Sequence, residues 1–169
     1  AVVGMTYFDG GKVHRQVALD RGGDTSEVLV DMAGIDTLRG AHNGENAAAA
    51  LILCEGLSVP RDVIDREMRT YPGLPHRMEQ VGCADRVVFI NDSKATNAES
   101  TQKALSSWGG GIYWILGGKP KEGGIGSLAP LFGRVAKSYL IGQAREMFAD
   151  TLTGHVPFER CGTLEVAVS

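Results

Sequence analysis

The sequence predicts an α/β fold with a mostly parallel sheet in its second half. Apolar, strand-like runs at residues 86–92, 111–118 and 138–142 alternate there with helical segments, the order typical of a parallel sheet covered on both faces. Glycine is abundant, at 23 of 169 residues against 6 prolines, which indicates many tight turns. The first half differs, because its strands come before its helices.

The first half opens with strand patterns. Residues 2–8 predict a strand that ends at Gly10, because glycine favours a tight turn. Residues 13–19 alternate apolar and polar side chains, as a half-buried hairpin partner does. Residues 27–32 are a further strand candidate.

The apolar period then becomes helical. Residues 46–57 are nearly all apolar and predict a strong helix with Gly56 as its stop. Pro60 opens a second predicted helix that runs to Arg69, since proline fits the first helical turn. The apolar face of this second helix carries Val63, Ile64 and Met68.

The clearest break lies at residues 71–75, where two prolines and a glycine interrupt the periodic patterns. It predicts a boundary between one domain at residues 1–72 and a second at 73–169. The second domain is expected to hold strands at 77–83, 86–92, 111–118 and 138–142, and helices at 97–106, 125–135 and 144–152.

Composition excludes several classes of protein. With 17 Lys and Arg against 20 Asp and Glu, the formal charge is −3, so a general nucleic-acid binder is not expected. No apolar run approaches the roughly 18 residues of a membrane span. Cys54, Cys83 and Cys161 are scattered and odd in number, which favours reduced thiols in the cytoplasm. The chain starts without Met and ends inside a regular pattern, so we expect a piece of a longer protein.

Candidate binding residues follow the strand at 86–92. Asp92, Lys94 and Thr96 stand together in one short loop before a helix, and ligands of parallel sheets sit beyond the carboxyl ends of strands. A carboxylate accepts hydrogen bonds from sugar hydroxyls, and a lysine meets carboxylate or phosphate as a point charge. The alternative is a helix cap from Ser93, Thr96 or Asn97.

A second strand end carries glycines and two lysines, Lys119 and Lys121. This composition predicts an anion site, or else a flexible solvated turn. The spacing does not match a Walker A loop, and no G-x-G-x-x-G is present.

Asn43 and Asn46 share one face at a helix start. Amide side chains can pair with the edge of a base, but taken alone the two residues are better explained as a capping pair. Arg77 at the domain boundary is suited to clamp a phosphate or ribose, or to form a surface salt bridge. The histidines and cysteines show no metal-ligand spacing.

Taken in order, these motifs resemble the Mur ligase family. They are G-x-H-N-x-x-N-x-x-A-A at 40–50, L-P-H-R-x-E at 74–79, N-D-S-K-A-T-N at 91–97, and L-G-G with lysines from 116. The third motif is most similar to that of the members that add D-glutamate to UDP-N-acetylmuramoyl-L-alanine in peptidoglycan synthesis.

The resemblance implies the end of a P-loop-type central ATPase domain at 1–72, followed by an incomplete, Rossmann-like carboxy-terminal domain at 73–169. The P-loop, the carbamylated lysine, the UDP-binding domain and the main Mg²⁺ ligands of the family have no counterpart in the chain. We therefore expect this part alone to be inactive. The last part of the carboxy-terminal domain, which helps to hold D-glutamate, is also expected to be missing.

The resemblance also implies residue roles. Asn43, Asn46, Arg77 and Asp92 would bind ATP, and Lys94, Thr96 and Lys121 would face D-glutamate or the product. Lys119 is a neighbour without a firm match, and His76 has no assigned role. The reaction would pass through an acyl phosphate, and no residue of the chain is assigned as its base.

Two other interpretations stay open. One is another amide-forming ligase of the superfamily, such as a folylpolyglutamate synthase, against which the motif at 91–97 argues. The other is a non-catalytic nucleotide-binding module, and an upstream P-loop would favour the ligase over it.

Overall fold

The computed structural model describes residues 5–18 and 24–169. The chain divides into two compact units, Ala1–Asp92 and Ser93–Ser169. The division thus falls after the 71–75 break, because a hairpin at residues 79–91 groups with the first unit. None of the helices in the described ranges is long and apolar enough to cross a membrane.

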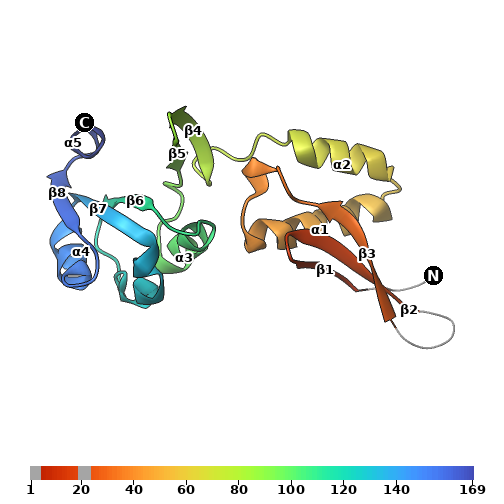
Figure 1. The fold of residues 1–169 in the computed structure, drawn as a ribbon, viewed down its shortest axis with the longest axis horizontal. Coiled ribbons are helices and arrows are strands. Elements are labelled where there is room, and N and C mark those ends of the chain that lie inside the picture. Colours follow the sequence, from red (N-terminus) through yellow and green to blue (C-terminus); the bar gives the residue numbers. More distant parts are fainter. Residues whose placement is uncertain (1–4, 19–23) are drawn as a thin grey trace. The chain divides into compact units, whose positions relative to one another are not determined.

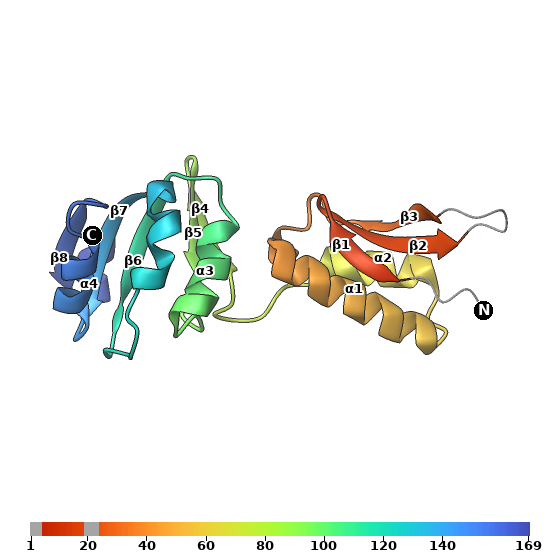
Figure 2. The ribbon, with the colours of Figure 1, turned by 90° about the horizontal axis from the view of Figure 1, so that it is seen from below.

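The first unit is built on an antiparallel sheet of order β1-β2-β3. Helix α1 packs beneath this sheet, and α2 packs against α1 (Figures 1 and 2). A separate antiparallel hairpin, β4-β5, completes the unit. The elements are β1 (Thr6–Asp9), β2 (Lys12–Ala18), β3 (Asp24–Asp31), the 3₁₀ turn η1 (Asp36–Leu38), α1 (Ala41–Gly56), α2 (Arg61–Thr70), β4 (Glu79–Ala84) and β5 (Val87–Asn91).

The core of the first unit forms where the sheet meets α1. Val13 and Leu51 are fully buried there, and Ile64 of α2 closes the cluster. Gly44 lies directly on the ring of Phe8, where a Cβ would collide with that ring. This close approach brings α1 onto β1, and a helix packed so tightly needs a residue without a side chain.

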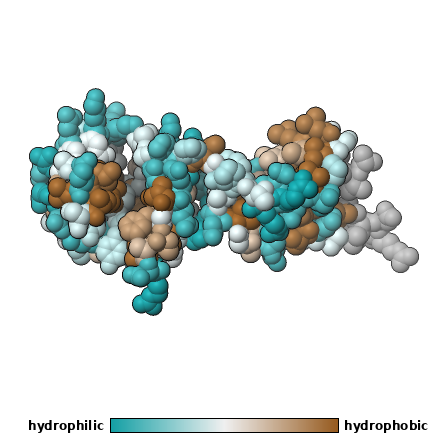
Figure 3. All heavy atoms as spheres, turned by 90° about the horizontal axis from the view of Figure 1, so that it is seen from above, coloured by the Kyte–Doolittle hydropathy of each residue, from teal (hydrophilic) through white to brown (hydrophobic). Residues whose placement is uncertain are grey.

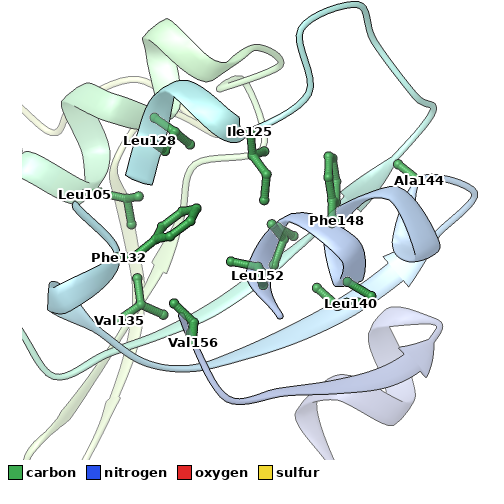
Figure 4. Close-up of a cluster of buried hydrophobic side chains, with 12 residues drawn as sticks. Leu105, Ile125, Leu128, Phe132, Val135, Leu140, Ala144, Phe148, Leu152 and Val156 are labelled. Atoms are coloured by element: carbon green, nitrogen blue, oxygen red, sulfur yellow. The ribbon is translucent and has the colours of Figure 1, made fainter. Parts of the chain in front are cut away.

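The second unit has a parallel sheet of order β6-β7-β8, as the alternating pattern predicted. Its elements are α3 (Ala98–Ser106), β6 (Ile112–Gly118), the 3₁₀ helix η2 (Gly126–Arg134), β7 (Val135–Gly142), α4 (Arg145–Leu152), β8 (Phe158–Gly162) and α5 (Leu164–Val168). The core lies between the strands and α3, η2 and α4. Figure 4 shows Phe132 and Leu152 pointing into this cluster.

Most expected elements are present with shifted ends. The helix expected at 46–57 begins at Ala41, five residues earlier, and the helix expected at 125–135 is a 3₁₀ helix with Pro130 inside. Pro130 has no N–H to donate, so it disfavours a regular α-helix. Residues 2–4 and 19 of the expected strands lie outside the described residues.

The strand expected to be buried at 86–92 was predicted wrongly in one respect. β5 pairs antiparallel with β4, and Val87, Val88 and Phe89 are all exposed. The sheet of the second unit is likewise not covered on both faces, since Tyr113 and Ile115 of β6 are exposed. Figure 3 shows apolar areas among the hydrophilic ones on the surface. Apolar content alone does not tell a core strand from an uncovered one.

Candidate functional site

A tight turn at residues 73–79 connects α2 to the β4-β5 hairpin. The N–H of Arg77 donates to the carbonyl oxygen of Leu74 at 3.1 Å. His76 and Met78, on either side of Arg77, both have left-handed backbones, with φ of 64° and 47°. Non-glycine residues adopt this conformation at a cost of roughly 1 kcal/mol or more. Further contacts must therefore stabilise this turn.

The first of these contacts reaches Asp92, directly after β5. The main-chain N–H of Met78 donates to Oδ1 of Asp92 at 3.0 Å. Burial raises the pKa of the half-buried Asp92 carboxyl above its ordinary value, while the Met78 N–H and the charges of His42 and Arg77 act to lower it. One carboxylate oxygen is thus held by main chain, and the charge of the exposed Arg77 acts on the same group.

The second contact is a side-chain network around Glu79, the first residue of β4. Oε2 of Glu79 accepts from the His76 N–H at 2.8 Å and from Nδ2 of Asn91 at 3.2 Å. Nδ2 of Asn91 also lies 2.9 Å from Nδ1 of His76. An amide nitrogen facing a carboxylate is a donor, so its second hydrogen points to Nδ1 of His76, which accepts. Strand pairing places Glu79 opposite Asn91.

Asn43 and Asn46 lie in the first turns of α1, in the same unit. Nδ2 of Asn43 donates to the carbonyl oxygen of Arg39 at 2.9 Å. The N-cap of α1 is Gly40, without a side-chain cap hydrogen bond. The capping interpretation of this asparagine pair is therefore wrong, because both residues belong to the helix and neither occupies the N-cap position. Asn46 is exposed.

Lys94 and Thr96 belong to the second unit, in the loop before α3. Both side chains are exposed, and the Thr96 N–H donates to the Lys94 carbonyl oxygen at 2.9 Å. Asn97 is the N-cap of α3, and its Oδ1 accepts from the Ser100 N–H at 2.8 Å. The cap is thus made by Asn97, and it leaves the lysine and threonine outside the helix.

The carboxyl edge of the parallel sheet is lined by glycine. β6, β7 and β8 end at Gly118, Gly142 and Gly162, which all have positive φ. A Cβ on Gly142 would lie 2.8 Å from the Gly118 nitrogen, so the first two strand ends approach too closely for a side chain. Lys119 and Lys121 follow the first of these glycines and are exposed.

The predicted site residues therefore fall into two sets. Asp92 accepts from the N–H of Met78, the residue after Arg77, in the first unit, and that unit also holds Asn43 and Asn46. Lys94, Thr96 and Lys121 belong to the second unit. Within residues 5–18 and 24–169, no group of three or more His, Cys, Asp or Glu side chains is arranged to hold a metal ion.

Sequence reasoning missed the part played by Glu79 and Asn91. Glu79 ends the motif at 74–79 and Asn91 begins the motif at 91–97, but no rule of sequence spacing links the two residues. The available signal was the hairpin itself, since antiparallel pairing across a tight turn brings the ends of two successive strands together.

Several known ligases of one kind have sequences similar to this chain. The chain is 53% identical over 155 residues to a UDP-N-acetylmuramoylalanine–D-glutamate ligase of Nitrobacter hamburgensis, covering 92% of this chain and 33% of that protein. It is 55% identical over 146 residues to the enzyme of the same name from Agrobacterium fabrum, covering 86% and 31%. The chain thus spans about a third of the length of these relatives. No family model matches it.

Solved structures agree on the fold. A UDP-N-acetylmuramate–alanine ligase from Thermotoga maritima matches with a TM-score of 0.60 and 14% identity, covering 92% of this chain and 36% of that one. MurF from Acinetobacter baumannii matches with a TM-score of 0.52 and 18% identity, covering 92% and 34%.

In fold, the chain is similar to Mur ligases of known structure. In sequence, most of it is similar to the UDP-N-acetylmuramoylalanine–D-glutamate ligases.

Proposed function

We propose that the full-length protein containing this chain is an ATP-dependent ligase of the cytoplasm. It adds D-glutamate to UDP-N-acetylmuramoyl-L-alanine in peptidoglycan synthesis. The observation that carries this proposal is the 53% identity over 92% of the chain to ligases named for that reaction. The motif at residues 91–97 lies within the matched region and contains three of the proposed binding residues.

Asn43, Asn46, Arg77 and Asp92 are the proposed ATP-binding residues. The arrangement at Asp92 fits a ribose, because one carboxylate oxygen is held by the Met78 N–H and a carboxylate has further acceptor sites for a sugar hydroxyl. ATP supplies the phosphoryl group that converts the substrate carboxylate to an acyl phosphate. The Mg²⁺ that accompanies ATP is held mostly by residues outside this chain.

Lys94, Thr96 and Lys121 are the proposed binding residues for D-glutamate or the product. Two lysines at strand ends supply positive charge to an amino acid with two carboxylates. Their task is to orient its amine for attack, and orientation accounts for a large share of the rate in such reactions. The proton that the ammonium group must lose is not assigned to any side chain of this chain.

The proposed domain boundary stays at residues 72 and 73. Residues 1–72 form the end of the ATPase domain, and residues 73–169 begin the carboxy-terminal domain. The turn at residues 73–79 supports this, since two left-handed residues and the glycine before them mark a change in chain direction.

The test is an assay of phosphate release by the full-length protein with ATP and Mg²⁺. We expect turnover that requires both D-glutamate and UDP-N-acetylmuramoyl-L-alanine. Turnover only with folate and L-glutamate would assign the protein to the folylpolyglutamate synthases. Nucleotide binding without turnover, in a protein that lacks an upstream P-loop, would leave a non-catalytic module.

A further inference from the structure

We propose that Glu79 is a positioning residue for the nucleotide, acting through the turn that carries Arg77 and Met78. This inference rests on the proposed function. It assigns a task to a carboxylate whose two hydrogen bonds both come from neutral donors, the main-chain N–H of His76 and the side-chain amide of Asn91.

The turn that carries Arg77 is strained. His76 and Met78 both adopt left-handed backbones, which side chains other than glycine resist. A carboxylate that accepts the His76 N–H at 2.8 Å stabilises the first of them directly. Charge-assisted hydrogen bonds of this kind are stronger than those between neutral groups.

The turn places two groups beside Asp92, the N–H of Met78 and the side chain of Arg77. With His76 held, the Met78 N–H points at Oδ1 of Asp92 at 3.0 Å. Arg77 lies between the two left-handed residues, and its charge acts on the same carboxylate. Without the Glu79 carboxylate, the turn would no longer hold the Met78 N–H and the Arg77 side chain in place beside Asp92.

A hydrogen bond between Asn91 and Glu79 also crosses the hairpin. Asn91 precedes Asp92 and donates from Nδ2 to Glu79 at 3.2 Å, and the same nitrogen contacts Nδ1 of His76 at 2.9 Å. The Glu79 carboxylate thus joins the end of β5, which precedes Asp92, to the turn that contains Arg77. Glu79 sets the distance between the two proposed nucleotide contacts without touching the nucleotide.

The experiment compares Glu79→Ala, Glu79→Asp and Glu79→Gln in the full-length protein. Glu79→Ala is expected to raise KM for ATP by about tenfold, the size of effect of losing a hydrogen bond to a charged group. KM for D-glutamate and kcat should change less than about twofold, because misplacement is confined to the nucleotide side. Glu79→Asp should resemble Glu79→Ala, since its shorter side chain cannot reach both donors.

Glu79→Gln should bring KM for ATP back to within about threefold of the wild-type value, because its amide oxygen still accepts both hydrogen bonds but lacks the charge that strengthens them. Gln80→Ala is the matched control, an exposed position next along β4, and should leave all three constants unchanged. If Glu79→Ala does not fold, Glu79→Asp decides the question.

A wild-type KM for ATP in Glu79→Ala or in Glu79→Asp would overturn the inference. So would a fall in kcat with KM for ATP unchanged, or an equal rise in both KM values, since these indicate a general structural role. Failure of Glu79→Gln to rescue would overturn it as well. An inactive wild-type enzyme would instead contradict the proposed function, so the two failures are distinguishable.

Discussion

The main-chain N–H of Met78 donates to Oδ1 of Asp92 at 3.0 Å, across a separation of 14 residues. This bond ties the turn before β4 to the end of β5. It occupies one oxygen of the carboxylate and fixes the direction of the other. Main-chain donors of this kind hold a carboxylate in place without a second charged side chain.

Replacing Asp92 by Asn should weaken ATP binding. The amide oxygen still accepts from Met78, but the negative charge that favours hydrogen bonds from ribose hydroxyls is lost. We expect KM for ATP in the full-length protein to rise about tenfold or more, with KM for D-glutamate changed much less. Steady-state kinetics with each substrate varied in turn measure both constants.

The control for Asp92→Asn is Asp150→Asn, an exposed carboxylate at the end of α4, which should leave both constants unchanged. Unchanged ATP affinity in Asp92→Asn would contradict the assigned role.

Lys121→Ala should act on the other substrate. Removing this exposed ammonium group takes away a positive charge that we assign to a carboxylate of D-glutamate. We expect KM for D-glutamate to rise about tenfold, the scale of a hydrogen bond to a charged group, and KM for ATP to stay within about twofold. Lys103→Ala, an exposed lysine in the last turn of α3, is the matched control. Equal effects of Lys121→Ala on both KM values would count against the assignment.

Glu55 links three elements of the first unit and should make its stability depend on pH. It accepts hydrogen bonds from Arg15 of β2 and from Arg61 of α2, the latter at 2.6 Å. Burial acts to raise the pKa of Glu55, but the hydrogen bonds and charges of the two arginines outweigh it and hold the pKa below its ordinary value. A lowered pKa means that the folded state favours the ionised carboxylate.

The stabilisation by Glu55 is therefore complete above its unfolded-state pKa and is lost as pH falls through the lower folded-state value. Urea unfolding of the chain should show Glu55→Gln less stable by about 1 kcal/mol at pH 7, with a difference that shrinks at acid pH. Glu67→Gln, in an exposed pair with Arg66, should change stability less. A difference for Glu55→Gln that is independent of pH would rule out this account.

Gly117→Ala should destabilise the second unit. A Cβ at this position collides with the main-chain oxygen of Ile141 on the neighbouring strand, and main chain within a parallel ladder cannot move aside cheaply. We expect a loss of about 1–3 kcal/mol, as for other overpacked sites, measured as a lower urea midpoint. Gly126→Ala, where a Cβ would meet nothing within 4 Å, should stay near the wild-type midpoint.

Periodic patterns were sufficient for most elements but not for all of them, and α1, β5 and β8 show why. The helix at α1 begins before the apolar run because Gly40 ends the preceding turn, and polar residues 42–46 gave no apolar period. β5 has the apolar run of a core strand but is exposed, and β8 at Phe158–Gly162 was not predicted at all. β8 carries two charged residues, so its strand character comes from pairing with β7.

The site divides in the same way. Asp92, Lys94 and Thr96 were singled out because they follow an apolar run that predicts a buried parallel strand, and ligands of parallel sheets gather beyond the strand ends. Glu79 was not singled out, because a glutamate at the start of a strand is ordinary, and only its contact with His76 and Asn91 sets it apart. A hydrogen bond between residues distant in sequence has no periodic signature.

Local sequence was enough for most of the order of strands and helices, for the break at residues 71–75 and for the motifs that carry the family resemblance. These depend on local chemistry, namely apolar period, chain-breaking residues and the types of side chain in a loop. Tertiary structure alone decided which apolar strands are buried, which asparagine caps a helix, and that Glu79 holds the turn beside Asp92. Those outcomes depend on which distant residues come into contact, and that information is not present in any local segment.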